Sequence, residues 1–350
     1  MNAFARTLLS GVFAGALMAG GLAGTADAKT IKIAHEEPAD AERSAAHISA
    51  LVFKDVIESR SNGEMSVDIH AASDLGNQRE RMELTKNDII QVNIASIGGL
   101  AGFYPTINAV DLPFALPNVT TAYKVFDGPF GQKLADDMEA ETGLKLLAVN
   151  AGGFYVLTNS ERPVKTPADM EGIKFRTMSV PSHIAMMESL GAAATPVPWD
   201  ELYSALQTGV VEGQHNPIPI MAIGNLQEVQ KYATLTNHLF GADWWVTSSA
   251  FYSGLSDAER VIFDDAVEAA KLAGRGAKLS LRATDFGVGF LKDAGMEVYA
   301  PTQDELAQFR EAAVPAVMKT IEEDLGEKGT ALANDLLDAV EAAQAGPAQN

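Results

Sequence analysis

The sequence predicts an α/β protein of two lobes, each a mixed sheet flanked by helices. Three observations lead to this fold class. Strand-like and helix-like segments alternate from residue 29 onward, the same alternation resumes after the glycine pair at 152–153, and a segment beginning at Ser256 is long enough to be a helix that spans both lobes. With the first 28 residues set aside, the remaining 322 of 350 suit about two domains.

The N-terminus has the pattern of an export signal. Arg6 supplies a positive charge, residues 8–24 form an apolar run, and Ala26-Asp27-Ala28 is a small-x-small cleavage site. A retained membrane helix is the alternative, but the run is rich in Gly and Ala and barely long enough to span. We therefore expect residues 1–28 to be a signal peptide cleaved after Ala28, and the protein to be periplasmic.

The first lobe is expected to start with three strands separated by two helices. The first helical segment shows apolar residues at a spacing of three to four, the second is a polar helix, and the third strand looks buried. The expected strands are 30–35, 65–72 and 89–98, and the helices between them are 41–63 and 78–88. A βαβαβ order predicts a largely parallel sheet. Residues 111–118, with two prolines, interrupt this order before a mostly helical stretch at 120–143.

The second lobe is expected to repeat the same order. Thr166 and Pro167 are typical of a helix N-cap and first helical position. Strand-like 173–178, helical 182–191, strand-like 194–199 and helical 200–209 follow.

A segment without proline from Ser256 to Gly295 predicts the long helix. Ser256 and Glu259 form a capping-box pair at its start. If it is continuous from Asp257, after the Ser256 cap, its 39 residues would run about 58 Å, which is enough to span both lobes. Gly274 and Gly276 leave open a break into two helices at that point.

Composition excludes several classes of function. The net charge of −20, without a basic segment, argues against nucleic acid as a partner. With no cysteine, the chain can form no disulfide, thiolate metal site or cysteine nucleophile. The six histidines show no metal-ligand spacing, and neither G-x-S-x-G nor H-E-x-x-H occurs. An exported hydrolase is thus the weaker alternative, with His35 its best candidate, and we expect no catalytic residue, metal or cofactor.

Arg176 is the most informative charged residue. It lies in the strand-like segment 172–178, on the opposite face from Phe175. The alternation by itself favours a solvated strand face for Arg176, and a negatively charged partner is the other reading.

Three motifs lie around Arg176, at residues 172–176, 191–196 and 201–217. They follow the pattern G-x-K-x-R, then G-A-x-P-x-P, then E-x-Y-x-A-L-Q-x-G-x-V-D-G-x-E-N-P. This pattern resembles that of a known family, the extracytoplasmic solute-binding proteins of tripartite ATP-independent periplasmic (TRAP) transporters. The departures are Ala194-Thr195 ahead of Pro196, Glu212 for the aspartate and His215 for the glutamate. The same motifs argue against a binding protein of an ATP-driven transporter.

The resemblance implies two lobes that close on a small anionic or zwitterionic solute. It implies delivery to two membrane subunits, one a small four-helix protein and one a large multi-span protein, by a binding protein expected to be monomeric. Lobe I is expected to comprise residues 29–152 and 239–275, and lobe II residues 153–238 and 276–345, with the ligand cleft between them.

The resemblance also implies roles for individual residues. Arg176 matches the arginine that forms a bidentate pair with the solute carboxylate, since a planar guanidinium fits that group. Asn216 matches an asparagine that binds the same acid group. Where sugar-acid binders carry a second arginine in G-F-R, this chain has Phe154 and Tyr155. Tyr155 cannot neutralise charge, so a singly charged acid is expected rather than a dicarboxylate.

Three further residues are candidates for the cleft. Trp199 and Trp244 stand where cleft walls are expected, although tryptophans are more often core residues and the pair 244–245 is expected to split. Glu37 follows the first strand, at the end of the sheet where α/β proteins bind ligands. An exposed loop carboxylate is its equally favoured alternative. These features resemble family members that bind zwitterions such as ectoine; a betaine-like or taurine-like solute, a hydroxy or keto acid, and a sugar acid stay open.

Overall fold

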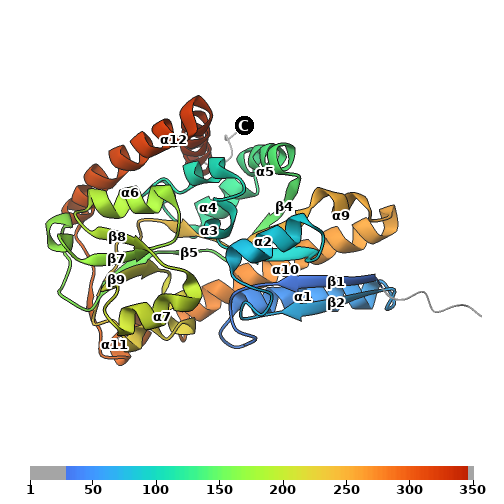
Figure 1. The fold of residues 1–350 in the computed structure, drawn as a ribbon, viewed down its shortest axis with the longest axis horizontal. Coiled ribbons are helices and arrows are strands. Elements are labelled where there is room, and N and C mark those ends of the chain that lie inside the picture. The colour runs from blue at the N-terminus through green and yellow to red at the C-terminus, as the bar shows by residue number, and fades with distance from the viewer. Residues whose placement is uncertain (1–28, 346–350) are drawn as a thin grey trace, which may run out of the picture.

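The computed structural model describes residues 29–345, so the expected signal peptide lies outside the described residues. Figure 1 shows two sheets side by side, with helix α10 (Asp257–Ala283) running past both. The expected fold class, sheets flanked by helices in two lobes with a long helix across them, is confirmed. No helix within the described range is long and apolar enough to cross a membrane.

The first sheet has the strand order β2-β1-β3-β12-β4. β1 pairs in parallel with β2 and β3, while β12 runs antiparallel to β3 and β4. The strands are β1 (Lys29–Ala34), β2 (Met65–His70), β3 (Val92–Ala95), β4 (Leu144–Val149) and β12 (Trp244–Ser248). The first three are those expected from the sequence. β12 joins them from a distant part of the chain.

Helices cover both faces of the first sheet. On one face, α1 and α10 bury a cluster that includes Phe53, Trp245 and Phe263. On the other face lie α2, α4 and α5. The bounds of these helices, besides α10, are α1 (Ala45–Arg60), α2 (Gln78–Lys86), α4 (Val119–Phe126) and α5 (Pro129–Thr142). Two short helices and a 3-10 turn lie near them: α3 (Ile97–Leu100), α9 (Ser249–Ser253) and η1 (Pro105–Val110).

The second sheet has the order β13-β10-β6-β9-β7-β8 and is mixed. β7 is parallel to β8 and β9, whereas β6 is antiparallel to β9 and β10. The strands are β6 (Val156–Asn159), β7 (Lys174–Thr177), β8 (Ala193–Pro196), β9 (Gly213–Asn216), β10 (Tyr232–Thr234) and β13 (Glu297–Tyr299). The helices and turns around it are η2 (Pro167–Met170), α6 (Pro181–Ser189), α7 (Trp199–Gln207), α8 (Ile218–Ile223), η3 (Leu226–Glu228) and α11 (Val288–Asp293).

Two short strands lie where the chain passes between the sheets. β5 (Gly153–Phe154) pairs antiparallel with β11 (Phe240–Gly241). A Cβ at Gly152 would lie 2.0 Å from the Phe240 ring, so the glycine permits this close pairing. The glycine pair at 152–153 is thus at a crossover, as its position between two strand-like runs suggested.

The long helix α10 ends earlier than the sequence pattern indicated. Its capping box forms as expected, with Ser256 N donating to Glu259 Oε2 at 2.7 Å. The helix stops after 27 residues at Ala283, and α11 begins at Val288, so a continuous 39-residue helix is wrong. The break lies at residues 284–287, not at Gly274 or Gly276, which are both inside α10. At Thr284 the backbone leaves the helical region, with φ −108° and ψ −82°.

The two glycines of α10 differ in their surroundings, which gives a prediction for stability. A Cβ on Gly274 would lie 2.1 Å from Ser49 Oγ of α1 and 2.7 Å from Asn150 Oδ1, whereas nothing lies within 4 Å of a Cβ on Gly276. We expect Gly274→Ala to destabilise the protein by about 1–3 kcal/mol through overpacking. Gly276→Ala, the matched control, should stabilise it by about 0.5–1 kcal/mol because alanine favours the helix. Urea unfolding of both variants measures the difference, and equal effects would contradict the packing argument.

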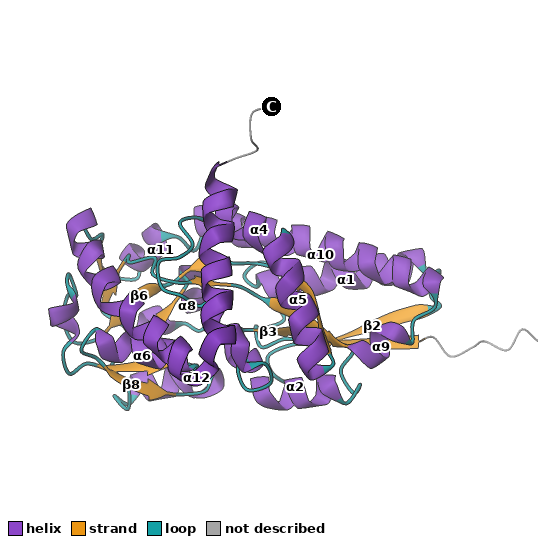
Figure 2. Ribbon diagram, turned by 90° about the horizontal axis from the view of Figure 1, so that it is seen from above, coloured by secondary structure: helices purple, strands orange, loops and turns teal. Residues whose placement is uncertain are grey.

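A second long helix, α12 (Gln303–Ala345), packs on α6 of the second lobe and on α4 and α5 of the first. It bends at Gly326, which has φ +59° and ψ −149°. Figure 2 shows the bend and the C-terminal part running over the middle of the molecule. Lys328, beyond the bend, pairs with Asp137 of α5 at 2.6 Å.

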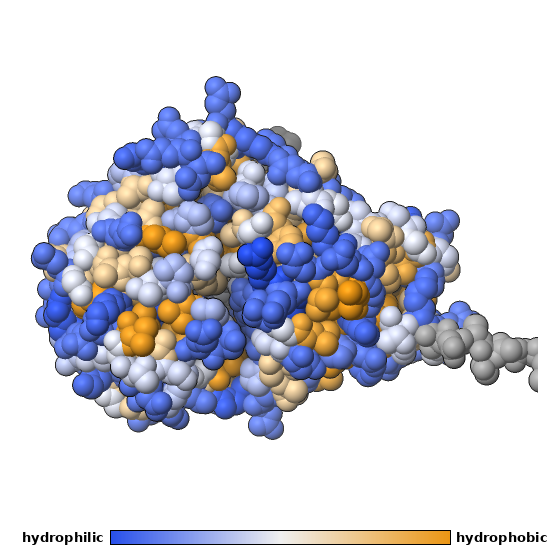
Figure 3. Space-filling model, viewed as in Figure 1, coloured by the Kyte–Doolittle hydropathy of each residue, from blue (hydrophilic) through white to orange (hydrophobic). Residues whose placement is uncertain are grey.

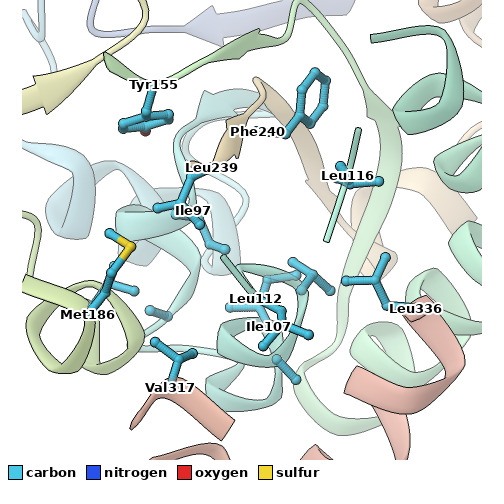
Figure 4. Packing of buried hydrophobic residues seen from close by; sticks show 14 of the residues in the cluster. Ile97, Ile107, Leu112, Leu116, Tyr155, Met186, Leu239, Phe240, Val317 and Leu336 are labelled. Carbon is cyan, nitrogen blue, oxygen red and sulfur yellow. The ribbon is translucent and has the colours of Figure 1, made fainter. Parts of the chain in front are cut away.

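The largest buried cluster runs from one lobe into the other. Figure 4 shows Tyr155 and Phe240 from the crossover region, Met186 from α6 and Ile107 from η1 facing a common core, with Val317 of α12 beside them. The lobes are therefore packed together on this side, and the cleft described next lies elsewhere between them.

Candidate functional site

A cleft lies between the two lobes at the carboxyl ends of β1, β3, β7 and β9. Lobe I lines it with residues that follow β1 and β3, lobe II with residues of β7, β9, α7 and α8, and residues of the crossover region also line it. A wider opening adjoins it at Gln78, Arg176 and Trp199. Figure 3 shows hydrophilic residues along the meeting line of the lobes, near the centre of this face.

Arg176 is buried in this cleft and is only partly paired. It is 3% exposed, and its Nε donates to the Val197 carbonyl at 2.8 Å. Within residues 29–345, the two terminal nitrogens have no hydrogen-bond partner and no carboxylate within ion-pair distance. Burial lowers the pKa of Arg176 to about 10, while Tyr155 and Glu36 act in the opposite direction. Since buried charges in proteins are normally paired, the free side of this guanidinium is suited to an anion.

A second arginine stands near the cleft, but its charge is used within the protein. Arg81 of α2 is fully buried; its Nη1 donates to Ser73 Oγ and to the Gly76 carbonyl, both at 3.0 Å. Its Nη2 lies 3.6 Å from Glu36 Oε2. Glu36 also accepts from Gln78 Nε2, and burial raises the pKa of Glu36 despite these partners. This pair contributes no free charge to the cleft.

Glu37 lines the cleft and is held by three groups. Its Oε2 accepts from Ser44 Oγ, the N-cap of α1, at 2.7 Å and from Ala46 N at 3.4 Å. Its Oε1 lies 3.5 Å from Nζ of Lys278, which is itself 3% exposed. Burial would raise the pKa of Glu37, but Lys278 and Ser44 hold it below its usual range. The Glu37 charge is therefore matched within the protein, and contact with a solute stays a prediction.

Asp243, between β11 and β12, also faces the cleft. Its Oδ2 atom is shielded from solvent and has no hydrogen-bond partner among the described residues. Burial raises the pKa of Asp243 to about 8, although Lys278 opposes this shift.

Tyr155 and Asn216 lie on the lobe II side of the cleft. Asn216, at the end of β9, donates from Nδ2 to Gln214 Oε1 at 2.7 Å. Tyr155 packs on His215, with ring centroids 5.1 Å apart. Burial raises the pKa of Tyr155, so the phenol is neutral. Behind it, His183 Nε2 pairs with Asp111 Oδ2 and His215 Nδ1 with His238 Nε2, and the rings of His183 and His215 pack edge-to-face.

The structure brings some predicted residues together and leaves others apart. Glu37, Tyr155, Arg176, Trp199 and Asn216 all line the cleft. Trp244 does not: it packs edge-to-face on Phe126, at 5.5 Å between ring centroids. Trp245 lies on the other face of the sheet, so the pair splits but both members are core residues. Phe154 points away from the cleft and packs on Phe240 at 5.5 Å.

Sequence reasoning missed Glu36, Asp243 and Lys278. Lys278 could have been noticed, because it interrupts the buried stripe of α10 that includes Val267, Ala270, Gly274 and Leu281. A lysine at an apolar position of a helix indicates a buried partner. Within residues 29–345, no group of three or more His, Cys, Asp and Glu side chains could hold a metal ion.

A two-lobed α/β fold whose interlobe cleft holds a buried, half-paired arginine defines a solute-binding protein. The chain belongs to the bacterial extracellular solute-binding proteins of family 7, the DctP family, whose model matches residues 35–324. The resemblance to the TRAP solute-binding proteins is thereby confirmed.

Relatives of the chain carry several solute names. The 2,3-diketo-L-gulonate-binding periplasmic protein YiaO of Escherichia coli is 33% identical over 253 residues, 72% of this chain and 76% of that protein. The ectoine-binding periplasmic protein TeaA of Halomonas elongata is 32% identical over 265 residues, 75% of this chain and 76% of that protein.

Solved structures show the same fold. A TRAP periplasmic solute-binding protein from Bordetella bronchispeptica, with density interpreted as pantoate, has a TM-score of 0.79 and 33% identity, covering 89% of this chain and 99% of that one. The sugar-acid-binding protein DctPAm from Advenella mimigardefordensis, in complex with galactonate, has a TM-score of 0.83 and 27% identity, covering 90% and 99%. The family is extracytoplasmic, binds small solutes and works with TRAP membrane subunits.

Proposed function

We propose that this protein captures a small, singly charged organic acid in the periplasm and delivers it to the membrane subunits of a TRAP transporter. The observation that carries this proposal is the guanidinium of Arg176, buried in the cleft with its two terminal nitrogens unpaired within residues 29–345. A carboxylate or sulfonate satisfies both nitrogens at once.

The charges around the cleft support a single negative charge on the solute. Arg81 pairs with Glu36, and Lys278 pairs with Glu37. Arg176 is left as the unmatched cation, and Tyr155 offers no second one. A dicarboxylate would place a second charge beside Glu36 and Glu37 without compensation, which is costly in a buried site.

Two classes of solute fit these features. A hydroxy, keto or sugar acid would use the polar groups of the cleft as hydrogen-bond partners. A zwitterion such as ectoine would need a negative or aromatic surface away from Arg176, for which Trp199 and the carboxylates of lobe I are available. The position of Glu37 in the cleft suggested a partner for the cationic end of a zwitterion. Because Lys278 already pairs with Glu37, this support for a zwitterion is weaker.

The role is binding without chemistry, and the finer features of the transport system belong to the same proposal. The partners would be a small four-helix and a large multi-span membrane subunit, and the binding protein would act as a monomer after cleavage behind Ala28. Contacts across the cleft support closure of the lobes: Arg43 Nη2, ahead of α1, donates to the Ala222 carbonyl of α8 at 2.6 Å.

A thermal-shift screen tests the proposed function. Pantoate, D-erythronate, galactonate, 2,3-diketo-L-gulonate, ectoine, taurine, butyrate and succinate are the probes. A solute present at 100 times its Kd adds about 2.7 kcal/mol to stability. We expect at least one singly charged acid or zwitterion to raise the melting temperature and succinate to have the smaller effect. A shift with succinate alone would contradict the single charge, and no shift with any probe would contradict the proposed solute class.

A further inference from the structure

Asp243 is held in place by its backbone but not by its side chain. Its carbonyl accepts from Asn150 N at 2.7 Å, and the next residue, Trp244, starts the buried strand β12. The carboxyl group faces the cleft, and neither oxygen has a hydrogen bond or ion pair among residues 29–345. The backbone therefore presents a carboxyl group to the cleft without a partner.

The nearby groups do not satisfy this carboxyl. Lys278 of α10 is the neighbouring cation, but its Nζ pairs with Glu37 Oε1 at 3.5 Å. Glu36 and Glu37, which follow β1, are like charges, and the tyrosines that face Asp243 are Tyr123 of α4 and Tyr155. Tyr123 uses its hydroxyl oxygen to accept from Gly152 N at 3.1 Å. A shielded polar atom such as Asp243 Oδ2 is unfavourable without a partner, and in a cleft water or a ligand satisfies it.

We propose that Asp243 binds the end of the solute that lies away from its acid group, and that the solute carries a hydrogen-bond donor there, either a hydroxyl or a protonated amine or amidine. This inference rests on the proposed function, because it takes Arg176 as the site of the acid group. Arg176 and Asp243 line the same cleft from different elements, β7 and the segment before β12.

The two kinds of donor differ in their effect on the proton of Asp243. With its pKa raised to about 8, Asp243 is protonated at neutral pH in the empty cleft. An acid with a hydroxyl tail adds a negative charge to the cleft and favours the protonated form, so its affinity should fall as the pH rises through 8. A cationic tail favours the ionised form, so the affinity of a zwitterion should rise over the same range.

Two variants of the full-length mature protein separate these possibilities. Asp243→Asn keeps the size and an accepting oxygen but removes the charge, and Asp243→Ala removes both. Calorimetry with pantoate and D-erythronate as hydroxy acids, ectoine as zwitterion and butyrate as an acid without a donor, from pH 6.5 to 9, gives the affinities. Circular dichroism and melting curves establish that each variant is folded.

We expect Asp243→Ala to weaken every tightly bound donor-bearing probe at least tenfold and to change butyrate binding less than threefold. Asp243→Asn should weaken ectoine at least tenfold, keep the hydroxy acids within threefold at pH 7, and abolish the pH dependence of both classes. If Asp243→Ala does not fold, the test rests on Asp243→Asn, in which the affinities of both classes of probe should no longer depend on pH. Wild-type affinity and pH dependence in the variants would overturn the role of Asp243 and leave the proposed function intact, whereas wild-type protein that binds none of the probes would overturn the proposed function itself.

Discussion

Replacing Arg176 with alanine is expected to remove solute binding while leaving the fold intact. The loss should be on the order of 2–5 kcal/mol, as for truncation of one member of a buried charge pair. In the empty protein, Arg176 donates one hydrogen bond, to Val197, and its charge is otherwise uncompensated. The variant without solute should therefore be at least as stable as the wild type. Arg176→Lys should also bind poorly, because an ammonium group cannot make the two parallel hydrogen bonds of a guanidinium.

Calorimetry with the tightest-binding acid of the screen, together with melting curves, measures both effects. Arg79→Ala is the matched control: Arg79 lies at the opening of the cleft with a side chain 85% exposed, so its removal deletes the same charge from the solvent side. Its effect on binding should stay below about 1 kcal/mol. Near-normal affinity in either Arg176 variant would exclude Arg176 as the acid-binding residue.

Replacing Lys278 with methionine is expected to have the largest effect on stability. Lys278 and Glu37 are 3% and 6% exposed, so methionine would fill the space but leave Glu37 buried without its cation. Breaking a buried pair in this way is typically unfavourable by about 3–5 kcal/mol. Glu36 faces the same cleft, so the uncompensated Glu37 carboxylate would also lie near a second acidic side chain.

The pH dependence of this loss has a definite sign. In the wild type, Lys278 and Ser44 keep the pKa of Glu37 below its usual range, so the pair stabilises the protein above the ordinary carboxyl pKa of about 4.3 and stops doing so as the pH falls through the lower, folded value. In Lys278→Met, burial without the cation should raise the pKa of Glu37 above the ordinary value. The variant should then gain stability on acidification from pH 7 to about pH 5, and its deficit should shrink.

Urea unfolding followed by tryptophan fluorescence at pH 7 and pH 5 tests this expectation. Lys319→Met is the control, since Lys319 of α12 is 72% exposed and pairs with Glu323 at 3.6 Å on the helix surface. It should change stability by less than about 1 kcal/mol at either pH. A deficit of Lys278→Met that is equally small, or that grows on acidification, would contradict a structural role for the buried pair.

The sequence by itself determined the features that depend on short-range patterns. Alternation along residues 30–35 and 173–178 identified strands β1 and β7, and the Ser256–Glu259 pair marked the first residue of α10 correctly, because capping involves neighbours three residues apart. Arg176 was found through its motif, since strand periodicity alone favoured a solvated face. Periodicity gives only the face of the strand on which Arg176 lies, whereas the motif indicated that this face meets a solute.

Only the tertiary structure decided which distant residues meet. Trp244 alternates with Trp245 as a strand predicts, but whether its face meets a cleft or a core depends on Phe126 of α4, far away in the chain. The pairing of Glu37 with Lys278, and the unpaired state of Asp243 that results, arise where a loop after β1, the helix α10 and a crossover strand come together. The end of α10 at Ala283, twelve residues before Gly295, was likewise not predicted from the sequence, because no proline stands at the break after Ala283. Local patterns determine which face of a helix or strand a side chain occupies. The groups that meet this face come from distant segments of the chain, and the local sequence holds no information about them.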